Sequence, residues 1–333
     1  MAGNTATRTY TIKKRKIPKV GEIVSYTPDT PSTGYDLSTA KSGYSSAQTI
    51  YGKYDPTTWK IMEVDENGNV TKLFGVPSSS QSTVYFKGST GYNNGVYLLN
   101  DICKSRYGNA SLGATARSLN IEDIESRMNS NGIAARNANK GYNNYSIQYG
   151  TTKTFTGSNA QYPAIYAQEK YSGVDVSDVT AGSQVIAGEV NATAQARMNP
   201  NGKSGSDNIY ATLPEKSETT GPSKTNLTCT QTFYGDLQSS SYFDDSNFYN
   251  MIFGTGTYFW LASRYVNCNS SLSYAGFGLR YVYVNLLRGV DLFSSKGFSY
   301  GINYRLAPVV SLGSGIQVKS GSGTTRDPYV IEK

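Results

Sequence analysis

The feature that most restricts the fold of this chain is a dense run of aromatic residues in its last third. After Tyr234 the run continues with Tyr242, Phe243, Phe248, Tyr249, Phe253, Tyr258, Phe259 and Trp260. Alternating strand-like segments and turns follow. Gly (34) and Tyr (28) are abundant while the hydrophobic fraction is 38%, so much of the buried area must come from aromatic rings. We therefore expect sheets and long surface loops instead of a helix bundle.

Short strands are also predicted near the start of the chain. Residues 20–26 alternate between apolar and polar side chains, and residues 58–64 place Trp59 inside an apolar strand. Residues 65–69, with the sequence DENGN, predict a turn before a second strand at residues 70–74. This is a hairpin signature. Residues 29–48 carry no periodicity and predict a loop.

Two helices are predicted between residues 92 and 132. Apolar residues in segment 92–107 recur at mixed three- and four-residue spacings, and the glycine that follows is a suitable C-cap. Asn120 is an N-cap for a shorter helix over residues 121–128, with acidic residues in its first turn. Asn131 and Gly132 predict the end of that helix.

The chain divides into four parts by composition. Residues 1–18 are predicted to be a basic N-terminal arm that either docks to a partner or is disordered. Residues 19–132 are predicted to form the N-terminal part of the folded scaffold. Residues 133–230 are rich in Asn, Gly, Ser, Thr and Ala, which predicts an insertion or long loop with one or two helical turns at residues 192–198. Residues 231–333 form a C-terminal module.

Most of the net charge lies in the N-terminal arm. The chain has a net charge of +7, and Lys13, Lys14, Arg15, Lys16 and Lys19 supply five of those charges. The globular part is thus nearly neutral. The favoured interpretation of this basic run is a solvated arm, followed by a docking segment for a carrier subunit. A nucleic-acid contact is the least favoured, because the rest of the chain is nearly neutral. We expect no nucleic-acid partner.

Enzymatic and metal chemistry are both disfavoured by composition. Histidine, the most frequent general base and metal ligand, is absent. Cys103, Cys229 and Cys268 are far apart in the sequence, so we expect no zinc site. The sequence allows one disulfide between two of the three cysteines. We expect no catalytic residue, no cofactor and no metal.

The N-terminus is polar and contains no apolar stretch of signal-peptide length, and no segment predicts membrane insertion. The sequence therefore predicts synthesis in the cytoplasm. If the protein acts outside the cell, we expect it to leave on a larger particle or by lysis.

Six segments carry a family resemblance. They are residues 92–103 (YNNGVYLLNDIC), 114–125 (ATARSLNIEDIE), 258–264 (YFWLASR), 278–282 (GLRYV), 305–312 (RLAPVVSL) and 323–331 (GTTRDPYVI). Together they resemble the C-type-lectin-fold variable proteins of gut Firmicutes and their phages, whose genes are diversified by retroelements. The resemblance covers most of the chain except residues 133–230. One departure lies just before Pro308, where the family pattern has an arginine.

This resemblance implies an α+β, C-type-lectin-like fold with short twisted antiparallel sheets, two helices and long irregular loops. It also implies a variable stretch at about residues 260–312, in which mutagenesis of Asn codons yields mainly Asn, Tyr, Ser, Asp and Gly. Many residues in this stretch are of those types. The expected ligand-binding residues are Tyr265, Asn267, Asn269, Ser271, Ser273, Tyr274, Tyr281, Tyr283, Asn285, Arg288, Asp291, Phe293, Phe298, Tyr300, Asn303 and Tyr304.

The residue types also favour binding on physical grounds. Tyr offers a rather rigid amphipathic ring, while Ser, Gly and Asn supply adaptable hydrogen bonds. The alternative is that these side chains only coat an ordinary sheet. Trp260 is interpreted as a core residue. Arg264 and Arg280 could contact a ligand or could be framework residues that bind carbonyls. Asp244 and Asp245 are interpreted as a solvated turn instead of a calcium site.

The function expected from the resemblance is receptor recognition on a phage tail or similar particle. The partners would be a host-cell surface protein or glycan, a carrier subunit that holds the N-terminal arm, and further copies of the chain in a homo-oligomer. A structural or adhesin protein that uses the same surface as a subunit interface is the first alternative. An enzyme of the formylglycine-generating type is the second, although Cys268 has no cysteine near it in sequence.

Overall fold

A computed structural model describes residues 17–29, 34–36, 49–50, 52–138, 147–161, 223–235, 239–269, 274–296, 298 and 300–333. Three of the expectations above lie outside these residues. They are the charged run at residues 13–16, the helical turns at residues 192–198, and Ser271 with Ser273. Most of the loop expected at residues 29–48 lies outside them as well.

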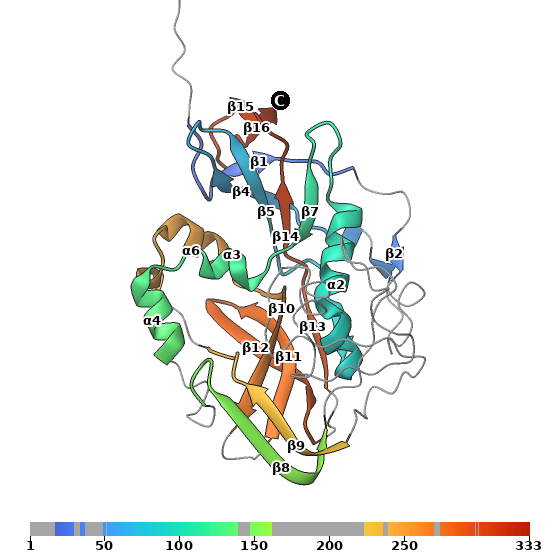
Figure 1. Cartoon of the computed structure of the whole chain (residues 1–333). Helices are drawn as coiled ribbons and strands as arrows, with labels where there is room; N and C mark the ends of the chain where they lie inside the picture. Colours follow the sequence, from blue (N-terminus) through green and yellow to red (C-terminus); the bar gives the residue numbers. More distant parts are fainter. Residues whose placement is uncertain are drawn as a thin grey trace, which may run out of the picture.

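A seven-stranded sheet joins the two ends of the chain (Figure 1). Its strands, in spatial order, are β15 (Gln317–Ser320), β16 (Tyr329–Glu332), β1 (Ile23–Ser25), β4 (Thr58–Val64), β5 (Val70–Val76), β14 (Pro308–Ser311) and β7 (Thr115–Ser118). Since four of these strands come from residues 19–132 and three from residues 231–333, both parts build one scaffold. The pairing of β1 with β16 is parallel, which differs from the purely antiparallel sheets that were expected.

The β4–β5 hairpin confirms the predicted turn. Asp65 accepts hydrogen bonds from the backbone N–H groups of Asn67 at 2.9 Å and Asn69 at 2.7 Å. Gly68 has a φ angle of 74°, a left-handed conformation that glycine adopts without steric cost. Local turn chemistry is therefore sufficient to define this hairpin.

A second, three-stranded antiparallel sheet contains the expected variable stretch. Its strands, in spatial order, are β10 (Tyr258–Asn269), β11 (Tyr274–Tyr283) and β12 (Leu286–Ser294). Three two-stranded sheets complete the described strands: β13 (Gly301–Tyr304) with β6 (Val84–Lys87), β8 (Thr152–Gln161) with β9 (Ser223–Thr230), and β2 (Tyr35–Asp36) with β3 (Thr49–Ile50).

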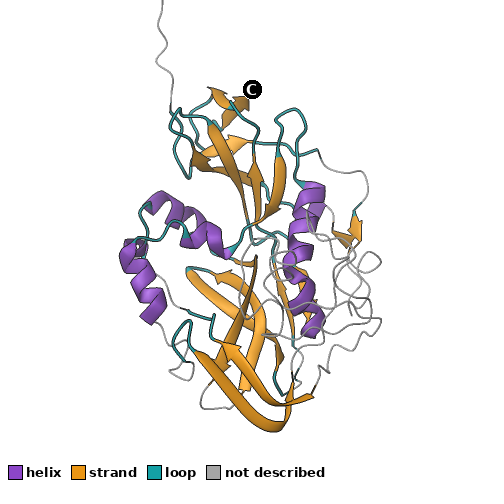
Figure 2. Cartoon of the chain, viewed as in Figure 1, coloured by secondary structure: helices purple, strands orange, loops and turns teal. Residues whose placement is uncertain are grey.

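Four α-helices lie in the described part of the chain: α2 (Gly88–Arg106), α3 (Ile121–Glu125), α4 (Ser130–Ala138) and α6 (Ser246–Phe253). Figure 2 shows α2 on one side of the molecule and the other three helices on the opposite side. Two short 3-10 turns occur at Gly52–Tyr54 and Ser240–Tyr242. Several sheets with few helices confirm the α+β class.

The first two helices lie where the sequence predicts them. Helix α2 begins at Gly88, four residues before the predicted start at residue 92. Asn120 caps α3 through a capping box, in which its side chain accepts from the Asp123 N–H and the Asp123 carboxylate accepts from the Asn120 N–H. Helix α3 ends at Glu125, earlier than predicted.

The other two helices correct the sequence analysis. Asn131 and Gly132 do not end a helix, because α4 runs through both residues. A Cβ added at Gly132 would collide with the backbone carbonyl of Tyr242, so this glycine permits close packing of the helix. Asp244 and Asp245 are not merely a solvated turn, since the Asp245 side chain accepts from the Asn247 N–H at 2.8 Å and caps α6.

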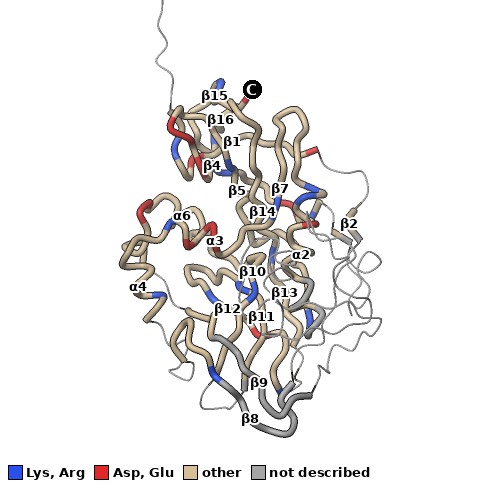
Figure 3. The backbone as a smooth tube through the Cα atoms, in the orientation of Figure 1, with Lys and Arg blue, Asp and Glu red and all other residues tan. Residues whose placement is uncertain are grey.

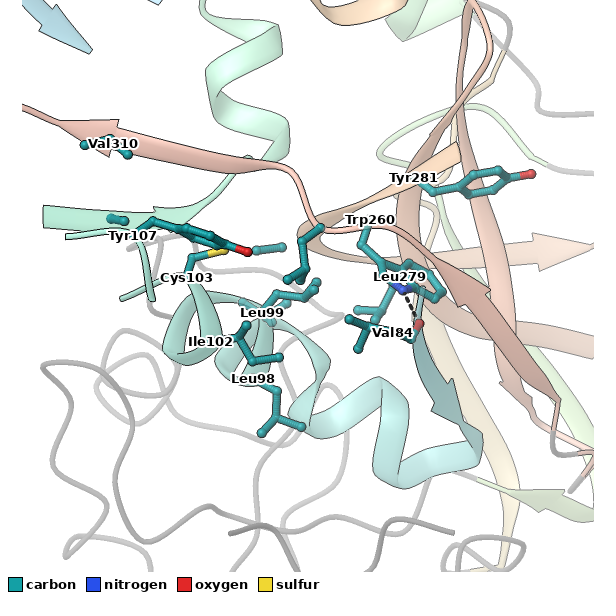
Figure 4. Close-up of a cluster of buried hydrophobic side chains, with 14 of the residues drawn as sticks. Val84, Leu98, Leu99, Ile102, Cys103, Tyr107, Trp260, Leu279, Tyr281 and Val310 are labelled. Atoms are coloured by element: carbon teal, nitrogen blue, oxygen red, sulfur yellow. Dashed lines mark hydrogen bonds between the residues drawn. The ribbon is translucent and has the colours of Figure 1, made fainter. Parts of the chain in front are cut away.

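The core extends from the large sheet to the smaller one along α2. Gly95 faces Leu279 on β11, and a Cβ at residue 95 would overlap the leucine side chain. Trp260 is fully buried, and its indole N–H donates to the Val84 carbonyl at 2.9 Å (Figure 4). This confirms that Trp260 is a core residue. No helix in the described residues is long and apolar enough to cross a membrane.

Candidate binding site

Four tyrosines from three strands gather into one group, which we call the tyrosine cluster: Tyr258 (β10), Tyr281 and Tyr283 (β11), and Tyr304 (β13). The rings of Tyr281 and Tyr304 stack with centroids 4.4 Å apart at 12°. Tyr258 contacts Tyr283 edge to face at 4.6 Å and stacks on Tyr304 at 5.9 Å. Aromatic pairs at such distances stabilise one another beyond their buried area, so the four rings form one ordered patch.

Strand pairing explains why these rings meet. Tyr258 pairs with Tyr283 across β10 and β11, and Trp260 pairs with Tyr281. Residues two apart on a strand point to the same face, so the four side chains share one face. Tyr304 then closes over this face from β13, and its ring contacts buried Trp260 at 4.6 Å. The core therefore holds the tyrosine cluster from below.

Two phenols of the tyrosine cluster, those of Tyr258 and Tyr304, have raised pKa values and stay protonated at physiological pH. Burial, together with neighbouring Tyr281, raises the pKa of Tyr304 well above its ordinary value. A hydrogen bond with Tyr283 raises the pKa of Tyr258. These hydroxyls can therefore both donate and accept hydrogen bonds to a partner.

Arg288 brings a positive charge to the tyrosine cluster. It pairs with Tyr281 across β11 and β12, and its guanidinium lies 5.3 Å from the centre of the Tyr283 ring. This is a cation–π arrangement. Figure 3 shows that charged residues are few along β10, β11 and β12, so Arg288 is one of the few charges close to the tyrosine cluster.

A pocket of about 250 Å³ adjoins the tyrosine cluster at the β12 edge of the small sheet, and we call it the β12 pocket. Tyr281 belongs to both features, and Arg288 lines the pocket while its guanidinium contacts Tyr283 of the cluster. The lining residues are Phe233, Gly235, Tyr265, Asn267, Tyr281, Arg288, Gly289, Val290 and Asp291. The pocket thus combines aromatic rings with a carboxylate, an amide and a guanidinium.

Glycines on two strands make room for the Tyr265 ring. A Cβ at Gly278 on β11 would lie 2.6 Å from this ring, and one at Gly289 on β12 would overlap it. Gly276 leaves similar space for the Asp291 carboxylate. Tyr265 consequently lies flat across the neighbouring strands and is 2% exposed.

Tyr265, which is buried, and Asp291, which is partly buried, form a hydrogen-bonded pair. The tyrosine hydroxyl donates to the carboxylate Oδ1 of Asp291. Burial raises the pKa of Asp291 from 3.8 to about 6, and the hydrogen bond from Tyr265 opposes part of that rise. Burial also raises the pKa of Tyr265 well above its ordinary value, as does the nearby Asp291 charge.

One wall of the β12 pocket is the segment that follows β9. Along this segment, Gln231 accepts from the Cys268 N–H at 2.5 Å, and the Thr232 hydroxyl accepts from the Val266 N–H at 2.6 Å. The next residue, Phe233, packs on Tyr265 with ring centroids 5.2 Å apart. The sequence analysis missed Phe233, although its place in the aromatic-rich last third was a usable signal.

The expected binding residues fall into three groups. Those that reach the tyrosine cluster or the β12 pocket are Tyr265, Asn267, Tyr281, Tyr283, Arg288, Asp291 and Tyr304. Other exposed ones are Asn285, Asn303, Phe298 (57%) and Tyr300 (44%). Asn269 is 8% exposed, and only the backbone of Tyr274 is described.

Phe293 corrects the expected surface. It is fully buried and packs on Phe277, its partner across β11 and β12, with ring centroids 6.5 Å apart. It belongs to the core and cannot contact a ligand. The Tyr265 ring is also buried, so it can offer a ligand only the part that lines the β12 pocket.

The sequence allows two roles for Arg264 and Arg280, ligand contact or framework. In the structure both side chains donate hydrogen bonds to backbone carbonyls. Arg264 donates to the Tyr92 carbonyl at 3.0 Å, and Arg280 donates to the Thr232 carbonyl. The Arg280 guanidinium also lies 4.7 Å from the Tyr234 ring centre. Both side chains are buried, so they support the framework.

Val284 lies at the tip of the β11–β12 turn beside Tyr283. Its φ angle is 53°, in the left-handed region that β-branched residues avoid, at a cost of roughly 1–2 kcal/mol. It is also 38% exposed. A two-residue hairpin connection requires a positive φ at its first residue, so the β11–β12 turn imposes this strain on Val284.

Replacing Asp291 with asparagine is expected to stabilise the protein above pH 6. The folded carboxyl has a pKa of about 6 against 3.8 in the unfolded chain, so the folded state binds the proton more tightly, and stability falls as pH rises from 4 to 6. Since Asp291 is only partly buried, we expect a gain of about 1–2 kcal/mol at pH 8. Thermal melting at pH 8 and pH 4 measures this. The same gain at both values would contradict it.

Among the described residues, no three acidic or cysteine side chains are grouped closely enough to hold a metal ion. Burial raises the pKa of the Cys103 thiol far above its ordinary range, which makes it a poor nucleophile. The arrangement offers stacking surfaces, hydrogen bonds and one carboxylate. Such a set is suited to binding.

Comparisons of this chain with known protein families, with curated proteins and with solved structures found no match. The function is therefore argued from the tyrosine cluster and the β12 pocket themselves.

Proposed function

We propose that this chain is a non-enzymatic recognition protein that binds a ligand on a host-cell surface through the tyrosine cluster and the adjoining β12 pocket. The observation that carries the proposal is the meeting of Tyr258, Tyr281, Tyr283 and Tyr304 on one face beside a pocket. Tyr and Arg are the residue types that dominate binding energy at protein interfaces. Arg288 supplies the second type.

Rigidity supports this proposal. The stacked rings of Tyr281 and Tyr304 rest on buried Trp260, so they lose little conformational freedom when a partner binds. Adaptable amides are exposed at neighbouring positions of the chain, Asn285 in the β11–β12 turn and Asn303 beside Tyr304 in β13. The same division between rigid aromatic anchors and adaptable amides occurs in antibody binding sites.

We also propose a C-type-lectin-like fold for the scaffold. Three features fit this proposal: strands from both chain ends share a sheet, α2 packs on the small sheet, and the expected variable stretch runs through β10–β13. The resembling segments occupy framework positions, with Trp260 in the core and Pro308–Ser311 as strand β14.

The proposed setting is a phage tail or similar particle, with the basic N-terminal arm docked to a carrier subunit. Several copies on one particle would raise avidity over a weak single contact. We propose no nucleic-acid partner, because most of the net charge lies in the arm.

A second candidate is a subunit interface. Phe298 and Tyr300 are the exposed large residues that favour it, at 57% and 44% exposure. Burying such side chains against another copy of the chain would be favourable. Under this alternative, loss of these aromatic residues would disrupt an oligomer and leave cell binding intact.

The test uses fluorescently labelled protein and host gut bacteria, with binding measured by flow cytometry. Replacing Tyr281 and Tyr304 together with alanine should weaken binding by about 100-fold or more, because each is expected to act as a hot spot of at least ~2 kcal/mol. Tyr249→Ala is the control, since this tyrosine stacks on Phe253 in α6 instead.

Two further measurements make the result decisive. Tyr283→Ala with Asn303→Ala changes only half-buried and exposed positions, so it should weaken binding without lowering the melting temperature by more than a few degrees. Light scattering reports the oligomeric state of every variant. Unchanged cell binding in both double variants would overturn the proposal, and a lost oligomer with intact binding would support the subunit interface.

A further inference from the structure

The β12 pocket contains a carboxylate surrounded by aromatic rings, and this arrangement suggests what it accepts. We propose that the pocket binds a cationic side-chain group, the ammonium of a lysine or the guanidinium of an arginine, on the surface of a protein receptor. The inference rests on the proposed recognition function and names the chemical class of the ligand. Asp291 and the rings of Phe233, Tyr265 and Tyr281 line the pocket.

Asp291 lacks a cationic partner within the described residues. The only donor to its carboxylate there is the Tyr265 hydroxyl, which takes Oδ1. Arg288 points toward the Tyr283 ring, and Arg280 binds the Thr232 carbonyl. A partly buried carboxylate with one neutral donor is poorly stabilised, and a cation entering the pocket would correct this.

The aromatic lining favours a cation over an anion. Phe233 and Tyr265 lie 5.2 Å apart at 49°, so they form two inclined sides of the pocket, and Tyr281 forms another. Ring faces attract ammonium and guanidinium groups. Asn267 adds an amide side chain to the lining.

The size of the pocket limits the ligand to one small group. Its volume of about 250 Å³ lies below the range of roughly 300–1,000 Å³ that is typical of sites for whole small molecules. A lysine or arginine end fits this description better than an oligosaccharide. The backbone of the receptor would then lie across the adjoining tyrosine cluster.

The geometry also predicts a pH dependence. The titratable groups that face Asp291 are Tyr265 on β10 and Tyr300 before β13, and the pKa of each is raised, so both stay neutral. The charged groups on the neighbouring strands are Arg280 on β11 and Arg288 on β12. Asp291 alone changes charge between pH 5 and 8, and because a cation needs the carboxylate, its affinity should fall as pH drops below about 6.

The probe is N-acetyl-lysinamide, and its neutral counterpart is N-acetyl-norleucinamide. Saturation-transfer NMR on the full chain at pH 8 should show saturable binding of the lysine probe, roughly tenfold tighter than the norleucine probe. Asp291→Asn should lower the affinity roughly tenfold, and so should pH 5. The matched control is Asp244→Asn, which removes an exposed carboxylate elsewhere.

Equal binding of the two probes, or a lysine affinity that Asp291→Asn leaves unchanged, would overturn the inference. Methyl glucoside that displaces the lysine probe, binds more tightly than it does and keeps its affinity in Asp291→Asn would do the same and would identify a neutral sugar site. If the tyrosine variants lose cell binding but the lysine probe does not bind the unsubstituted chain, only this inference is wrong. If the probe binds while those variants keep cell binding, the proposed function is wrong instead.

Discussion

Replacing Asp55 with alanine should lower the free energy of unfolding by about 3–5 kcal/mol. The reason is Arg106, whose side chain is 1% exposed. Its Nε and Nη2 atoms donate to the two carboxylate oxygens of Asp55 at 3.0 and 2.7 Å, and its Nη1 donates to the Ile50 carbonyl at 3.2 Å. Tyr107 also donates to Asp55, at 2.8 Å. Without the carboxylate, a guanidinium would remain buried and uncompensated.

Urea denaturation followed by circular dichroism measures this effect. The matched control is Glu332→Ala, which breaks an ion pair with Lys319 at 2.5 Å whose partners are 59% and 50% exposed. Exposed pairs contribute roughly 0–1 kcal/mol, so the control should change stability little. If Asp55→Ala cost no more than the control, Arg106 would not depend on this pair.

Replacing Trp260 with alanine should cost a similar amount, about 3–5 kcal/mol. The indole is fully buried, packs on Phe86 at 5.4 Å and contacts Tyr304 at 4.6 Å. It also donates its N–H to the Val84 carbonyl at 2.9 Å. Its removal leaves a cavity beneath Tyr304 and an unpaired carbonyl, so cell binding should weaken as well (Figure 4).

Trp260→Phe separates packing from hydrogen bonding. Phenylalanine retains most of the ring volume and loses the N–H, so we expect a cost of about 1–3 kcal/mol for the unpaired carbonyl and the smaller ring. Leu261→Val, a smaller change at another buried position of β10, serves as the control. A loss below 1 kcal/mol for Trp260→Ala would show that the small sheet does not depend on this residue.

These two sites explain how stability and recognition are connected. Arg106 and Asp55 hold the end of α2 on the segment after β3, and α2 in turn packs against the small sheet. Trp260 links that sheet to β6 and to Tyr304. Because the tyrosine cluster lies on this rigid base, its exposed residues can be substituted without loss of the fold.

Features that depend on local chemistry can be predicted from the amino-acid sequence. The β4–β5 hairpin follows from Asp65 and Gly68, α3 follows from the Asn120 capping box, and α2 follows from its apolar periodicity. The burial of Trp260 follows from its apolar strand. For the hairpin and the two helices, the determining contacts lie within a few residues along the chain, whereas Trp260 packs against distant residues such as Phe86.

Which side chains share a face depends instead on strand pairing over long distances in the chain. The register between β10 and β11 shifts by two residues between Trp260 and Arg264, which preserves the alternation, and the register between β11 and β12 shifts by one at Leu292. Because side chains alternate with a period of two, a shift of one residue exchanges the two faces of a strand. Together with packing by distant segments, this register leaves Phe293 and Tyr265 buried and brings Tyr281, itself only 8% exposed, into the tyrosine cluster.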